Sequence, residues 1–150
     1  MLITNEEVIS IAFVSAVEAV NIKDSVIMNA QLTYIKPALS LPLYIVVESS
    51  PESYPELITQ YLKPCLSYYV KYLAYSTLFI EKSGSIGLID PIYSVTNFTE
   101  IRQASIQDSL SIAQNFEKAM VDYIILQSDP EYQPPTPPVE TGRLKCGFYI

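Results

Sequence analysis

The sequence contains no histidine and only two cysteines, Cys65 and Cys146. Histidine is the commonest general base and the commonest protein ligand of transition metals, so its absence removes both roles together. A structural zinc site takes four ligands, which two lone cysteines cannot supply. Two such cysteines favour a reducing compartment without a disulfide framework. We therefore predict that the chain binds no metal ion and no cofactor.

Patterns of catalytic residues are missing as well. The sequence has only four glycines, and the stretch from Gly84 to Gly87 lacks the spacing that cradles a phosphate. Asp90 and Glu100 are isolated carboxylates, which we interpret as solvated surface charge. No catalytic residue is assigned, and we predict that the protein is not an enzyme.

Basic residues are scarce and scattered. Nine lysines and arginines face sixteen acidic residues, which leaves a net charge of −7 and no basic stripe for nucleic acid. Glu6 and Glu7 stand where a signal peptide would carry basic residues. The apolar run from Val8 to Val20 is too short to span a membrane. We expect a soluble protein that is made in the cytoplasm and has no membrane partner.

What the sequence does have is helical periodicity over most of its length. With 49% hydrophobic residues it can form a core, and we predict a mainly α fold, a small bundle of about four helices over residues 1–129. Thr4 and Glu7 form a capping box at the first helix, and Asn21 caps the next. Pro37 ends or bends that helix, and Pro64 kinks a later one or splits it near Lys63. The predicted helices cover residues 5 to between 13 and 19, 22–36, 43–47, 55–82 and 100–126, the last capped by Thr99.

The helix over residues 57–82 carries two adjacent apolar seams. The first seam consists of Tyr61, Cys65, Tyr68, Tyr72, Tyr75 and Phe79, and the second of Leu62, Leu66, Tyr69, Leu73, Ser76 and Ile80. A narrow polar edge remains, made of Lys63, Ser67, Lys71, Thr77 and Glu81. A helix with so much apolar surface must be central. Tyrosine is enriched at interfaces, so we assign a subunit interface to Tyr61, Tyr68, Tyr72, Tyr75 and Phe79. The alternative is an ordinary buried core helix.

Two segments lie outside this helical pattern. Residues 83–98 form a long loop or hairpin between the last two long helices, with a strand-like middle that exposes Ile86, Leu88, Ile89, Ile92 and Tyr93. Residues 130–150 form an extended, proline-rich C-terminal arm with a strand-like apolar peptide that includes Phe148, Tyr149 and Ile150. Such an arm can reach a neighbour, and the alternative is a frayed tail.

A sequence pattern near the start resembles head-to-tail adaptor (connector) proteins of tailed bacteriophages. It begins with Leu2-Ile3-Thr4 and Glu6-Glu7 and continues as Ile27-x-x-Ala30-Gln31-x-x-Tyr34-Ile35-x-Pro37-x-Leu39-x-x-Pro42-Leu43-Tyr44. Those families have a Leu-Gly-x-x-Leu-Tyr turn, and here Ser40 stands in the glycine position. The chain is most similar to the neck ring proteins of crAss-like phages, over residues 2–129.

The resemblance implies a helical connector domain that assembles with copies of itself into a ring, a dodecamer, in the virion neck. The ring would link the portal protein to other neck or tail proteins and extend the channel, with genomic DNA only as passing cargo. The apolar residues of the loop and of the arm would then contact the portal or the tail. Assembly would take place in the host cytoplasm. The alternative is a helical protein-interaction or regulatory module, not viral, without catalysis.

Overall fold

The computed structural model describes residues 1–13, 22–83 and 95–134, with side chains for residues 1–13, 22–74 and 103–134. These residues are mainly helical and include no strand, which confirms the predicted mainly α fold. The helices are α1 (Asn5–Ala12), α3 (Asp24–Ala30), α4 (Lys36–Leu39), α5 (Leu41–Ser49), α6 (Lys63–Ser83) and α7 (Val95–Gln127). Two π-helical segments, Gln31–Ile35 and Leu57–Leu62, and a short 3₁₀ turn, Pro51–Ser53, lie between them.

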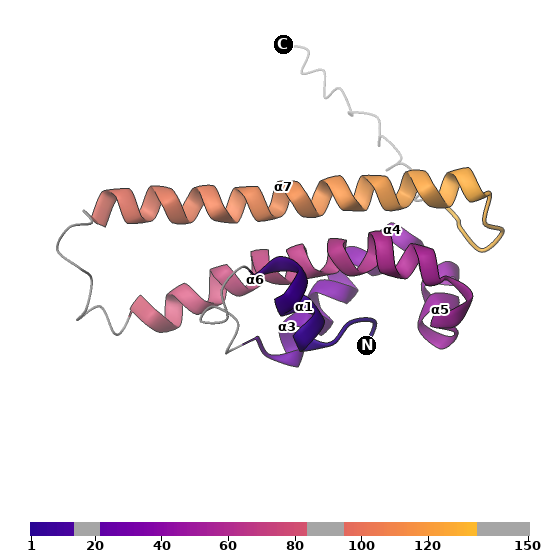
Figure 1. The fold of residues 1–150 in the computed structure, drawn as a ribbon, viewed down its shortest axis with the longest axis horizontal. Coiled ribbons are helices and arrows are strands. Elements are labelled where there is room, and N and C mark those ends of the chain that lie inside the picture. The colour runs from indigo at the N-terminus through magenta and orange to yellow at the C-terminus, as the bar shows by residue number, and fades with distance from the viewer. Residues whose placement is uncertain (14–21, 84–94, 135–150) are drawn as a thin grey trace, which may run out of the picture.

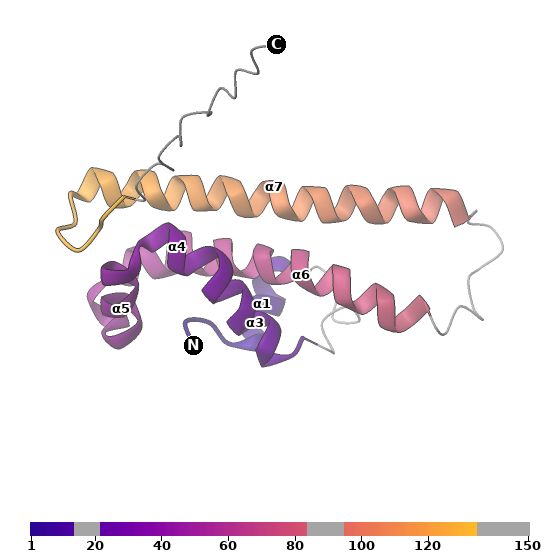
Figure 2. The same cartoon turned by 180° about the vertical axis from the view of Figure 1, so that it is seen from behind.

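The helix α6 lies in the middle of the molecule. The long helix α7 runs along one side of α6, and α1 and α3 pack on the other side, as both views show (Figures 1 and 2). At 1.5 Å per residue, a helix as long as α7 extends over about 50 Å. The central place predicted for this helix is thus confirmed for its described side chains, and its own chain covers it on both sides.

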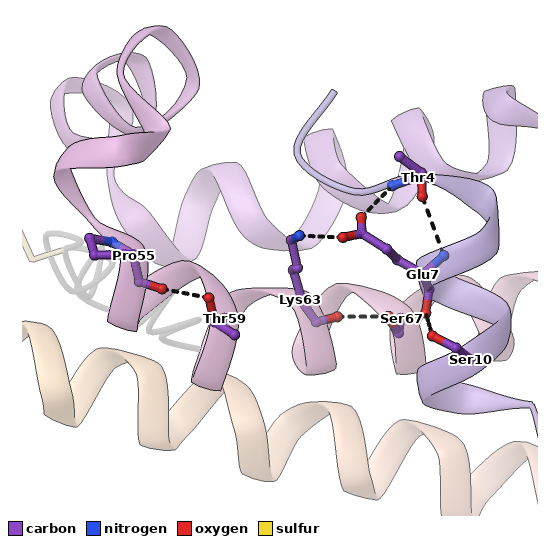
Figure 3. Close-up of polar contacts among 7 residues, drawn as sticks. All are labelled: Thr4, Glu7, Ser10, Pro55, Thr59, Lys63 and Ser67. Atoms are coloured by element: carbon purple, nitrogen blue, oxygen red, sulfur yellow. Dashed lines mark hydrogen bonds and ion pairs between the residues drawn. The ribbon is translucent and has the colours of Figure 1, made fainter.

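The capping box at the first helix is present as predicted. Glu7 N–H donates to Thr4 Oγ1 over 3.3 Å, and Thr4 N–H donates to the Glu7 carboxylate over 2.9 Å (Figure 3). The same carboxylate forms an ion pair with Lys63 of α6. The Glu7 side chain therefore caps the start of α1 and also fastens α1 to the central helix α6.

The described part of the polar edge predicted on the central helix, Lys63, Ser67 and Lys71, faces α1. The Ser67 side chain is buried, and its hydroxyl donates to the Lys63 carbonyl over 2.7 Å (Figure 3). Lys71 Nζ donates to the Ala12 carbonyl at the end of α1 over 2.8 Å. A lysine can cover apolar surface with its long aliphatic stem while its ammonium group binds a polar partner. Lys63 and Lys71 can therefore lie against α1.

Pro37 and Pro64 are accommodated by wider helical turns. The helix around Pro64 is divided near Lys63, as predicted, because a π-helical segment ends at Leu62 and α6 begins at Lys63. At Pro37 the helix does not end, since the π-helical segment Gln31–Ile35 passes directly into α4. A proline ring clashes with the carbonyl four residues earlier, here Thr33 and Gln60. An i→i−5 hydrogen bond, such as Lys36 N–H to the Gln31 carbonyl, widens the turn and relieves that clash. The helical path consequently continues through both prolines.

The turn between α4 and α5 has an unusual backbone. Ser40 adopts φ 65° and ψ 157°, a region that is essentially restricted to glycine. Its carbonyl accepts the Tyr44 N–H over 3.0 Å, so this residue starts α5. The short helical turn predicted over residues 43–47 is longer in the structure, because Pro42 fits the first turn of a helix.

The last helix begins before its predicted start. It includes residues 95–99, so Thr99 is not its cap, because no glycine or proline interrupts the chain between Val95 and Gln127. The predicted apolar face is turned inward, with Ala113, Met120 and Ile124 buried. Ser128, at φ 54°, takes the left-handed conformation that commonly ends a helix.

The hydrophobic core is shared by all these helices. Its fully buried side chains are Val8, Ile27, Ala30, Ile35, Leu39, Leu43, Val47, Leu62, Cys65, Leu66, Val70, Ala113 and Met120. The residues 14–21, 84–94 and 135–150, which include Asn21, the strand-like part of the loop and most of the arm, lie outside the described residues.

Candidate functional site

The first tyrosine seam of the central helix faces α7. Tyr61 stacks on Tyr123 with ring centroids 4.8 Å apart, and Tyr68 stacks on Phe116 at 6.1 Å. Between these two pairs, the buried Cys65 thiol donates to the Ala113 carbonyl over 3.5 Å. Burial raises the pKa of this thiol far above its usual range, so it is held as a neutral packing group and not as a nucleophile.

These contacts with α7 do not decide whether the same tyrosines also contact a second copy of the chain. The rings of Tyr61, Tyr68 and Tyr72 are each half-buried, so each keeps part of its surface accessible. The side chains of Tyr75 and Phe79 lie outside the described part of the chain. A contact with a second copy at this seam therefore stays a prediction, limited to the parts of the rings that α7 leaves open.

The residues predicted to contact a portal or tail are not described. The loop residues Ile86, Leu88, Ile89, Ile92 and Tyr93 and the arm residues Phe148, Tyr149 and Ile150 fall in residues 84–94 and 135–150.

A groove lies between the π-helical segment Gln31–Ile35, α6 and α7. Its volume is about 480 Å³, and its lining consists of Tyr34, Tyr69, Gln114, Glu117, Lys118, Val121 and Asp122. At its base Tyr34 and Tyr69 stack face to face, with ring centroids 3.9 Å apart and planes 2° from parallel. The Tyr69 hydroxyl donates a hydrogen bond to the Glu117 carboxylate.

The groove offers surfaces for stacking and hydrogen bonding, and the pKa values of both of its tyrosines are raised. Burial, followed by the hydrogen bond to Glu117, raises the pKa of Tyr69 far above its usual range. Burial also raises the pKa of Tyr34. Among residues 1–13, 22–74 and 103–134, no three acidic, cysteine or histidine side chains come together as they would around a metal ion.

Sequence reasoning missed this groove. Tyr34 and Tyr69 belong to separate predicted helices, and nothing in their spacing along the sequence links them. Glu117 lies 48 residues beyond Tyr69. Only the crossing of three helices brings these side chains together, so no local signal could have revealed them.

A second polar cluster joins the residues of the N-terminal sequence pattern. Gln31 is fully buried, its side-chain carbonyl accepts the Leu2 N–H over 3.0 Å, and its amide donates to the Tyr44 hydroxyl over 2.6 Å. The same amide and the Tyr44 hydroxyl both donate to Glu48, over 3.3 and 3.2 Å. A buried amide with all its partners fixes one arrangement of the chain. This cluster fastens the N-terminus and α5 to the helix between them.

Comparisons with protein-family models, with curated proteins and with solved structures found no match to this chain. In the part of the chain that the structure describes, each helix is too short or too polar to cross a bilayer.

Proposed function

We propose that this chain is a structural, non-catalytic protein that assembles with copies of itself into a ring in the neck of a tailed bacteriophage. The ring links the portal to the tail and extends the DNA channel. The observation that carries the proposal is the backbone of Ser40, which adopts a glycine conformation at the position where the adaptor families have glycine. The turn expected from the resemblance is therefore formed even though its usual residue is absent.

The Gln31 cluster adds support of the same kind. Leu2, Gln31 and Tyr44 belong to three separate parts of the resembling pattern, and hydrogen bonds join them in one buried unit. A chance match of apolar spacings would not require these polar residues to meet. The residues of the pattern therefore form one packed unit, as expected of a chain that shares the fold of the families it resembles.

One observation favours the alternative, a helical interaction or regulatory module that acts without a ring. The tyrosines that were assigned to a subunit interface already have partners within the chain, since Tyr61 packs on Tyr123 and Tyr68 on Phe116. A monomer could therefore satisfy much of this seam by itself.

The mass of the intact assembly decides between the two functions. We expect native mass spectrometry of the purified chain to show a closed oligomer, with the dodecamer as the expected size, and negative-stain micrographs to show rings with a central hole. A matched measurement over a range of protein concentrations separates a ring from non-specific association, because a closed ring stops growing at one size. A monomer or dimer at every concentration would favour the interaction module instead.

A further inference from the structure

Helix α5 leaves two large apolar side chains uncovered on its exposed face. Leu43, Tyr44 and Val47 are buried, whereas Leu41 and Ile45 are 55% and 54% exposed. Leu41 and Ile45 lie four residues apart and share one face of the helix. Large apolar side chains that are exposed together mark a surface suited to a partner.

The C-terminal arm leaves the body of the protein beside this face. Gln133 N–H donates to Ser40 Oγ over 3.2 Å, and Ser40 directly precedes Leu41. The Tyr132 side chain next to it is half-buried against the core. The arm is therefore fastened to the body at the start of α5, and the chain continues from Pro134 at this point.

The sequence of the arm indicates what it carries and how far. Sixteen residues follow Pro134, among them Pro135, Pro137 and Pro138, and the apolar peptide begins at Leu144. Proline-rich chain extends about 3.1 Å per residue, so ten residues reach about 30 Å. The nine residues of α5 extend over only about 14 Å. The arm is therefore long enough for its peptide to reach the α5 face of a second copy.

Charge is complementary between the peptide and the far end of α5. Arg143 and Lys145 flank the start of the apolar peptide. On the body, Glu48 at the end of α5 and Glu52 just after it are both exposed. Basic residues beside an apolar segment would favour a docking surface with apolar residues at one end and carboxylates at the other.

We propose that the apolar peptide Leu144–Ile150 of one copy docks on the Leu41/Ile45 face of α5 in a second copy. This contact rests on the self-assembly in the proposed function and deepens it. It assigns Phe148, Tyr149 and Ile150 to a neighbouring subunit, whereas the sequence suggested a portal or tail partner. Each arm that crosses to the next subunit would connect the copies in a head-to-tail order, as a closed ring requires.

A photo-crosslink in the full chain tests the contact. Phe148 is replaced with p-benzoylphenylalanine (Phe148→p-benzoylphenylalanine), the purified protein is illuminated, and the products are separated under denaturing conditions. We expect a species at twice the 16.8 kDa mass of one chain, with its crosslink, after proteolysis, in the segment Leu41–Ser49. The change Ile45→Ser should reduce the yield of this species at least several-fold.

The control variant is Leu126→Ser, which removes an equally apolar side chain that is 81% exposed at the end of α7. It should leave the crosslink yield unchanged, and circular dichroism should show both variants folded. A crosslink to α5 at the mass of a single chain, a crosslink elsewhere, or no crosslink would each overturn the proposal. If native mass spectrometry still shows rings in that case, the proposed function stands and only the arm contact fails. Monomers throughout would contradict both.

Discussion

Ser40 is the residue whose conformation departs most from what its side chain favours. A non-glycine residue at φ 65° and ψ 157° carries a strain of about 1–3 kcal/mol. The turn is retained because Leu39 and Leu43, on either side, are fully buried and fix the directions of α4 and α5. The packing of two short helices therefore determines the backbone of the residue between them.

Replacing Ser40 with glycine should stabilise the protein. Ser40→Gly removes the Cβ that causes the strain, and the greater freedom of glycine in the unfolded chain offsets about 0.5–1 kcal/mol of the gain. We expect a net rise of about 1 kcal/mol in the free energy of unfolding, measured by urea denaturation. Ser40→Ala is the control, because it keeps the Cβ and removes only the hydroxyl that accepts the Gln133 N–H. A glycine variant no more stable than the alanine variant would show that the turn is not strained.

The ion pair between Glu7 and Lys63 gives stability a dependence on acid pH. The Lys63 ammonium, followed by the Thr4 N–H, lowers the pKa of the Glu7 carboxyl below 4.5. A carboxyl whose pKa is lower in the folded state stabilises the fold above its unfolded pKa, and this stabilisation is lost as the pH falls through the folded value. The effect therefore belongs to the range below about pH 4.5.

Removing the charge of Glu7 should test this pair. Glu7→Gln should lower the free energy of unfolding at pH 7 by less than about 1 kcal/mol, because the side chain is 38% exposed and exposed pairs are weak. It should also make the denaturation midpoint less sensitive to pH below 4.5. Lys63→Met and the double variant complete a thermodynamic cycle at pH 7. If the double variant loses as much free energy of unfolding as the two single variants lose together, the two side chains do not interact.

At the scale of elements, the central helix has two kinds of tyrosine. Tyr69 is 2% exposed and stacks on Tyr34, so its ring belongs to the folded subunit. Tyr72 is half-buried, and the predicted subunit interface includes it. The heptad spacing placed Tyr72 on one seam with Tyr61 and Tyr68. It could not show that α7 of the same chain would cover part of that seam.

Alanine substitutions should separate these two roles. Tyr69→Ala should lower the free energy of unfolding by about 3–5 kcal/mol, as expected for a buried aromatic ring. Tyr72→Ala should weaken assembly more than it destabilises the subunit, because part of its ring is left for another copy. Denaturation curves and native mass spectra of both variants provide the comparison. If Tyr72→Ala unfolds the subunit as strongly as Tyr69→Ala and leaves the oligomer intact, Tyr72 is a core residue.

At the scale of the whole molecule, charge is the dominant property. The net charge of −7 is carried by a chain with only nine basic residues, and a ring multiplies it by the number of copies. On the described part of α7, the exposed residues Gln107 and Ser111 are uncharged and Asp108 is acidic, while Gln114, Lys118 and Asp122 lie along the groove. A channel lined by such residues would let DNA pass without holding its phosphates. The alternative is that the acidity only keeps the free subunit in solution.

The isolated protein should not bind duplex DNA tightly. In a fluorescence anisotropy titration at roughly 150 mM salt, we expect no binding at micromolar or lower concentrations, because no phosphate is neutralised by a basic belt. The triple variant Gln107→Lys, Ser111→Lys and Gln114→Lys is the positive control. It should bind DNA with an affinity that falls as salt rises. Micromolar or tighter affinity of the unaltered protein would contradict a passive channel.

The sequence by itself determined the local elements of this protein. The capping box of Thr4 and Glu7, the amphipathic faces of α7 and the end of α6 before Gly84 all follow from interactions within a few residues, which sequence patterns record directly. The exact helix boundaries near Pro37 and Pro64 do not follow from the sequence, because a π-turn depends on how the helix on either side is packed.

Only the tertiary structure decided which faces meet. It paired the tyrosine seam with α7, turned the polar edge of the central helix toward α1, and brought Tyr34, Tyr69 and Glu117 to one groove. It also left the Leu41/Ile45 face of α5 uncovered, which an apolar sequence such as that of α5 does not reveal. The physical reason is that helix periodicity fixes which residues share a face, whereas contacts between residues tens of positions apart depend on the relative placement of whole helices.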